Sequence, residues 1–187
     1  MIVLALGVLL LALQHLVVAV PALKRRLKQR IGERAFGAGF GVTSLAGIAV
    51  IVLGWRMSDF VAVYDPPVWG RHVDYGLTLI AFICLGIFLF RGSLRQTLRF
   101  PMAIAAICWA IGHLFANGDM RSLILFGGIL AYGLAHLLVG LGNGVRPSPE
   151  VRGGHNLMSI LSGVALYGVM TQLHPILIGV PVFSLGG

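Results

Sequence analysis

KRRLKQRIGER, residues 24–34, carries six positive charges between two long apolar runs, and this contrast decides the fold. The runs on either side of it, residues 2–23 and 37–55, approach the ~20 residues that an α-helix needs to cross a bilayer. Four more apolar runs follow, at residues 75–90, 100–117, 121–143 and 156–178. The sequence therefore predicts an all-α fold, a polytopic membrane bundle of about six transmembrane helices that forms a single integral membrane domain over residues 1–187.

The composition supports this fold and narrows the range of partners. Hydrophobic residues make up 58% of the chain and charged residues 11%, with a mean hydropathy of +0.94, whereas a soluble domain carries about a quarter charged residues. The net charge of +8 gathers between the apolar runs and comes with no aromatic-basic surface motif. This distribution argues against nucleic acid as a partner, and the lipid bilayer is the expected one.

The basic residues indicate the orientation of the helices. Eleven of the fourteen lysines and arginines fall in the loops after the first, third and fifth spans, and the exceptions are Arg56, Arg71 and Arg121. Positive residues favour the cytoplasmic face of a membrane. Both termini of this multi-pass protein are therefore expected on the outer side of the membrane.

The second span carries a G-x-x-x-G pair, Gly37 and Gly41. Small residues let membrane helices approach each other closely. The pair predicts that this helix is central and tightly packed, and that its glycines serve packing and not chemistry.

Three histidines fall near the middle of the predicted bilayer. At about 1.5 Å per residue, His15, His136 and His113 lie roughly 13, 15 and 21 Å from the inner edge of the hydrocarbon. An ionisable side chain at such depth is costly, so each is a functional candidate by default. Trp109, His113 and Asn117 follow one another at four-residue intervals and share one helical face.

The chemistry of imidazole limits which cofactor these histidines could bind. Two neutral imidazoles from facing helices can bind the iron of haem b axially inside a bundle. Zinc or copper would prefer further thiolate or carboxylate ligands, and a proton relay usually recruits Asp or Glu, but no carboxylate is expected at that depth. Two alternatives stay open: a cofactor-free assembly or scaffold protein whose histidines only pack, and a transporter, although the chain lacks a clear internal repeat.

Four segments carry a family resemblance: His15 followed by the basic stretch, IGERAFGAGFGVTSLAG at 31–47, WAIGHLFANGD at 109–119 and AHLLVGLGNGVR at 135–146. In this order they resemble the NnrU family of bacterial membrane proteins and, more distantly, 15-cis-zeta-carotene isomerase. The NnrU branch implies a place in the bacterial inner (plasma) membrane, with both termini on the periplasmic side, and an accessory role in denitrification, in support of nitrite and nitric oxide reduction. The isomerase branch implies, if the protein is an enzyme, haem-dependent cis-trans isomerisation of a lipophilic polyene such as zeta-carotene.

The resemblance also implies a ligand set for haem b. His15 and His113 match the positions of the axial ligands to the haem iron, and His136 matches a further histidine that is the alternative ligand. Ala110 stands where the isomerase has a cysteine, which argues against a switch to a cysteine ligand here. A lipophilic substrate or nitric oxide would then bind where one axial ligand leaves the iron.

Other polar residues complete the expected site. We expect Trp109 and Asn117 to accompany His113 on its face, and Arg25 and Arg34 to hold the haem propionates. Asn117 also begins an Asn-Gly-Asp sequence that is typical of a helix end, with Asp119 as the cap of the next helix.

Overall fold

The computed structural model describes residues 1–182, so residues 183–187 of the predicted domain lie outside the described residues. The described part forms eight α-helices: α1 (Ile2–Ala19), α2 (Pro21–Ile31), α3 (Glu33–Arg56), α4 (Gly70–Leu89), α5 (Ser93–Leu98), α6 (Pro101–Ala116), α7 (Met120–Gly142) and α8 (His155–Ile178). Extended pairing in these residues is limited to one isolated bridge, between Ala62 and Asp119. The all-α prediction is confirmed.

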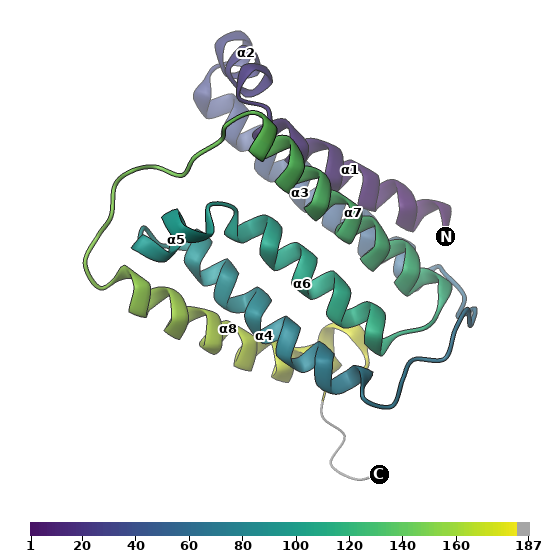
Figure 1. Cartoon of the computed structure of the whole chain (residues 1–187). Helices are drawn as coiled ribbons and strands as arrows, with labels where there is room; N and C mark the ends of the chain where they lie inside the picture. The colour runs from purple at the N-terminus through teal and green to yellow at the C-terminus, as the bar shows by residue number, and fades with distance from the viewer. Residues whose placement is uncertain (183–187) are drawn as a thin grey trace.

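The helices that could cross a membrane match the predicted spans. Five of those described, α1, α3, α4, α7 and α8, are long and apolar enough to do so, and α6 is a shorter apolar helix of 16 residues. All six run between the same two ends of the molecule (Figure 1). The fold is a multi-pass helical membrane bundle.

Two predicted boundaries moved for local reasons. The first span ends at Ala19, because Val20 is extended (φ −112°, ψ 92°) and Pro21 starts a new helix, α2. The basic stretch is therefore mostly helical, where a loop was predicted. The third span starts at Gly70, before the predicted residue 75, which places Asp74 inside α4.

The long helices form a row whose order differs from their order in the chain. Helix α3 packs on α1, α1 on α7, α7 on α6, α6 on α4, and α4 on α8. Only 6% of the apolar windows of α3 and α8 is buried, against 22% for α1, α4 and α7, because α3 and α8 stand at the two ends of the row. The prediction that the second span is central was wrong.

The glycine of α3 that lies closest to the backbone of α1 is Gly54, and not one of the predicted pair. A Cβ atom on Gly54 would lie 2.4 Å from the backbone nitrogen of Leu4, whereas Gly37 and Gly41 have no such neighbour within 4 Å. Close backbone approach therefore depends on Gly54, at the far end of α3 from the G-x-x-x-G pair.

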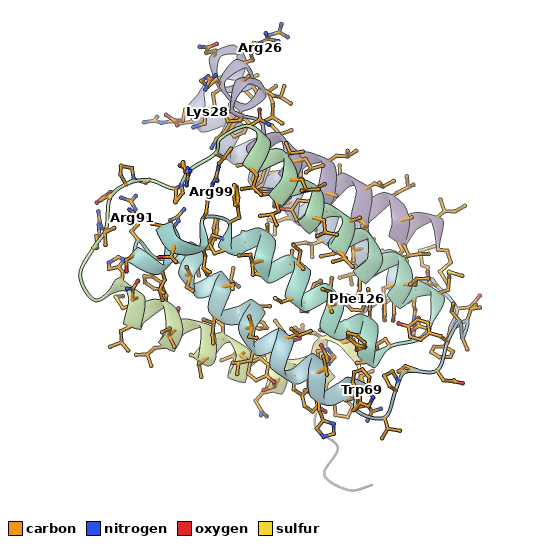
Figure 2. The ribbon with its side chains drawn as sticks, in the orientation of Figure 1. Arg26, Lys28, Trp69, Arg91, Arg99 and Phe126 are labelled. Carbon is orange, nitrogen blue, oxygen red and sulfur yellow. The ribbon has the colours of Figure 1, made fainter. Side chains whose placement is uncertain are left out.

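The two ends of the bundle differ in charge. At one end the Met1 amine donates to Ser58 Oγ at 2.9 Å and the Tyr75 hydroxyl donates to the Val182 carbonyl at 2.7 Å, so residues 1 and 182 lie at the same end. Figure 2 shows labelled basic side chains gathered at the opposite end: Arg26, Lys28, Arg91 and Arg99. The predicted separation of charge between the two ends is present.

Candidate functional site

A cavity of about 350 Å³ lies among five of the helices, and its volume is that of a small-molecule site. Its lining residues are Leu11 and His15 of α1, Ser44 and Ile48 of α3, Ala81, Phe82 and Leu85 of α4, Met102, Ala105, Ala106 and Trp109 of α6, and Ile129 and Tyr132 of α7. Most of these side chains are apolar. His15 is the imidazole on this wall.

The α3 side of the cavity reaches the surface of the bundle. Ile48 lines the cavity and yet is 50% exposed. Helix α3 packs on α1 and helix α4 on α6 and α8, but α3 and α4 are not a packed pair although both line the cavity. The cavity thus lies between two helices that do not pack extensively on each other.

His15 is held by its own helix. Its Nδ1 lies 2.8 Å from the carbonyl oxygen of Leu11, one turn earlier. A carbonyl only accepts hydrogen bonds, so Nδ1 carries the proton and Nε2 keeps the lone pair that can bind a metal. The ring also packs edge-on against Phe40 and Tyr132, with centroids 4.8 and 5.9 Å away.

His113 has the same local geometry and one further neighbour. Its Nδ1 lies 3.0 Å from the Trp109 carbonyl, again one turn earlier, and 3.1 Å from Oδ1 of Asp74 on α4. Both neighbours are acceptors, so Nε2 again keeps the lone pair. The ring packs against Phe126 with centroids 4.4 Å apart and against Trp109 at 5.0 Å.

The expectation that no carboxylate lies at the depth of the histidines was wrong. Asp74 belongs to α4 because that helix starts at Gly70. The neighbour of His113, Gly112, admits the carboxylate: a Cβ there would lie 2.6 Å from Asp74 Oδ1. A glycine beside the histidine and an aspartate at the edge of a predicted span were the signals in the sequence.

His136 shares a tyrosine with His15. The Tyr132 hydroxyl lies 3.4 Å from His136 Nδ1, and the Tyr132 ring lies 5.7 Å from that imidazole and 5.9 Å from His15. The spacing of Tyr132 and His136, one helical turn on α7, was visible in the sequence. The contact of that tyrosine with His15 on α1 was not.

The three histidines therefore fall into two groups. His15, Tyr132 and His136 form one, and His113, Asp74 and Trp109 form the other. Trp109 lines the cavity beside His15 and packs on His113, whereas His113 and His136 do not line it. Residues 1–182 hold no cluster of three or more His, Cys, Asp or Glu suited to a metal ion. Haem iron needs only one or two protein ligands, because the porphyrin nitrogens fill its other positions, and of the three histidines His15 is the one that lines the cavity.

The remaining predicted site residues lie away from the cavity. Asn117 ends α6 and its Nδ2 donates to the His113 carbonyl at 2.9 Å. Asp119 caps α7 by accepting from the backbone nitrogen of Ser122 at 3.2 Å, as predicted. Arg25 on α2 and Arg34 on α3 are exposed, and neither lines the cavity.

The loop between α3 and α4 folds over the end of α6. The backbone nitrogens of Val63 and Tyr64 donate to the Gly118 carbonyl at 2.8 and 3.1 Å. The Tyr64 hydroxyl donates to the carbonyls of Leu114 and Asn117. Burial, and then the negative charge of Asp119, raise the pKa of Tyr64 above its ordinary value. These contacts fix the end of the helix that carries His113.

The row of apolar helices and the imidazoles inside it define a multi-pass helical membrane protein with histidines in its interior. The family model described as NnrU protein matches residues 3–182. The chain belongs to the NnrU family, as its sequence resemblance indicated. Comparison with curated proteins and comparison with solved structures gave no match, and the more distant relationship to zeta-carotene isomerase stays a prediction.

Proposed function

We propose that this protein binds haem b inside the bundle, with His15 and His113 as axial ligands and His136 as the alternative. The observation that carries the proposal is the geometry common to His15 and His113. In each, Nδ1 is held by the carbonyl one turn earlier, at 2.8 and 3.0 Å, which leaves Nε2 free to bind iron. Preset orientation of this kind is typical of metal-binding histidines.

The cavity supports the same proposal. It is almost wholly apolar, it has His15 on its wall, and Trp109 connects that wall to His113. An apolar surrounding with few polar groups is typical of cofactor sites inside helical bundles. When bound, haem b would supply an iron that can take a diatomic gas or a double bond after one axial ligand leaves. The residues of this chain orient the imidazoles and keep water away.

Two observations support a biological role: membership of the family and the apolar lining of the cavity. Family membership supports a role in denitrification, linked to nitrite and nitric oxide reduction, in the bacterial inner membrane with the basic end in the cytoplasm. The apolar lining suits nitric oxide, and it also suits a lipophilic polyene, for which the activity would be cis-trans isomerisation as in zeta-carotene isomerase.

The first experiment is an absorption spectrum of the purified protein, oxidised and then reduced with dithionite. We expect a Soret peak with sharp b-type bands, which His15→Ala and His113→Ala shift or abolish. His174→Ala is the matched control, because its Nδ1 also contacts a carbonyl, that of Val180 at 2.6 Å, and His174 is only half-buried and does not line the cavity. Unchanged spectra in both central variants would move the assignment to His136.

A second set of measurements separates the roles. Nitric oxide is added to the reduced protein while the spectrum is followed, and zeta-carotene isomers are incubated with the protein and separated by chromatography. A spectral change with nitric oxide and no isomerisation supports the denitrification role, and the reverse supports the isomerase. A colourless protein, even after growth with a haem precursor, would contradict haem binding and leave a cofactor-free assembly protein.

A further inference from the structure

The contact between His113 and Asp74 crosses from α6 to α4. Nδ1 of His113 lies 3.1 Å from Oδ1 of Asp74, and the two side chains are only 14% and 16% exposed. A carboxylate inside a membrane bundle is expensive unless it faces a donor or a positive charge. The Nδ1 side of His113 faces the carboxylate at ion-pair distance, while the hydrogen bond of Nδ1 goes to the Trp109 carbonyl.

The carboxylate is itself held in place. Thr78, one turn later on α4, donates its hydroxyl to Asp74 Oδ1 at 3.0 Å. On the other helix, Gly112 leaves the room that the carboxylate occupies, because a Cβ at that position would lie 2.6 Å from Oδ1 and 3.1 Å from the Asp74 Cα. Thr78 on α4, with Gly112 and His113 on α6, therefore determines the position of the Asp74 carboxylate.

The charge lies on the Nδ1 side of the ring, opposite the nitrogen that is free. The Trp109 carbonyl at 3.0 Å and Asp74 at 3.1 Å both face Nδ1. The Trp109 carbonyl already sets the tautomer, and a carboxylate in this position increases electron donation from Nε2 to a bound metal. His15 has the carbonyl contact with Leu11 and a 3.4 Å contact with the amide of Gln14, and within residues 1–182 it has no carboxylate partner.

We propose that Asp74 is a positioning residue for His113, which makes its Nε2 the stronger of the two donors and lowers the reduction potential of the iron it binds. The proposal rests on the proposed function, because the iron is that of haem b. Asp74 would make His113 and His15 unequal in electron donation. His15, whose ring lies on the wall of the cavity, would then be the weaker donor of the two to a bound haem iron.

The test compares Asp74→Asn, Asp74→Ala and the control Asp65→Asn, which removes the same charge from an exposed loop position. The readouts are haem affinity and the midpoint potential of the purified haem protein. We expect Asp74→Asn to keep haem and raise the midpoint potential, and Asp74→Ala to weaken haem binding by about 10–100-fold, as loss of a metal ligand's partner typically does. Asp65→Asn should match the wild type. Potentials and affinities equal to the wild type in both Asp74 variants would overturn the proposal.

Nitrogen-15 NMR of the histidines separates this proposal from haem binding itself. In haem-free wild-type protein we expect His113 as the Nδ1–H tautomer; in Asp74→Ala the Trp109 carbonyl keeps this tautomer, and we expect the ring-nitrogen signals to shift because the carboxylate is lost. One outcome is a wild type that binds no haem while the His113 signals still differ between the wild type and Asp74→Ala. In that case the proposed function fails and the positioning role of Asp74 stands. Identical His113 signals in the wild type and Asp74→Ala would refute the positioning role.

Discussion

The Tyr132 hydroxyl lies 3.4 Å from Nδ1 of His136, while the Tyr132 ring packs edge-on against His15 on another helix. One tyrosine of α7 therefore serves two histidines through different parts of its side chain. The hydroxyl partners His136, and the ring supports His15 at a centroid distance of 5.9 Å. The two contributions can be separated, because phenylalanine keeps the ring and loses the hydroxyl.

Tyr132→Phe should lower the free energy of unfolding by about 0.2–0.5 kcal/mol, the usual contribution of a side-chain pair one turn apart on the same helix. It should leave any spectral signature of His15 unchanged, because the ring contact persists. Unfolding in a denaturing detergent measures the first effect and absorption the second. Tyr167→Phe, on α8 at the end of the row, is the control. A changed haem spectrum in Tyr132→Phe would mean that His136 and not His15 binds the iron.

Gly54→Ala should separate α1 from α3, because the new Cβ would lie 2.4 Å from the backbone nitrogen of Leu4. Backbone cannot move aside as a side chain can, so we expect a loss of about 1–3 kcal/mol in the free energy of unfolding. Gly41→Ala is the matched control on the same helix, and it should gain about 0.5–1 kcal/mol since nothing stands in its way. Equal losses in the two variants would show that Gly41 also packs against a neighbour.

Glu150 should make the stability of the basic end depend on pH. A hydrogen bond and the positive charge of Arg152, with the charge of Arg91, lower the pKa of Glu150 below its ordinary value of 4.5. Its stabilising contribution is therefore complete above pH 4.5 and disappears as the pH falls through the lower, folded-state pKa.

The measurement for Glu150 is the unfolding midpoint of the wild type and of Glu150→Gln across this pH range. The wild type should be the more stable at pH 7, and the difference should vanish in acid. High salt should also reduce the difference, because Glu150 and its arginines are exposed and salt screens exposed charges. A difference that stays constant in acid would exclude the carboxylate as its source.

The ends of most spans, and the basic end of the bundle, could be predicted from the sequence. The free-energy cost of burying a charged side chain depends on that residue and not on which helix packs beside it. Lysine and arginine are excluded from hydrocarbon whichever helix lies next to them, so their positions determine where spans begin and end. The end of α6 and the cap of α7 could be predicted for a similar reason. Asp119 satisfies backbone groups within three residues of itself, and such contacts are local.

The order of the helices could not be predicted, because it depends on which faces meet. The G-x-x-x-G pair at Gly37 suggested close packing, but the same pattern fits any helix face, and here that face has no neighbour within 4 Å. The contact of Asp74 with His113 was missed for a related reason. A predicted start at residue 75 left the aspartate in a loop, and its helix became evident only with the backbone.

The exposed position of Ile48 on the cavity wall has a consequence for how occupancy is measured. Helix α3 is one of the helices that could cross a membrane, so in a bilayer this wall would face hydrocarbon, and an apolar ligand of the proposed site would enter from lipid and not from water. The concentration that governs binding is then the mole fraction of the molecule in the membrane, which its partition coefficient determines. If the total amount of such a molecule is fixed, added lipid lowers its mole fraction in the membrane and so lowers the occupancy of the site. Added buffer lowers the occupancy only to the extent that the molecule leaves the lipid for water.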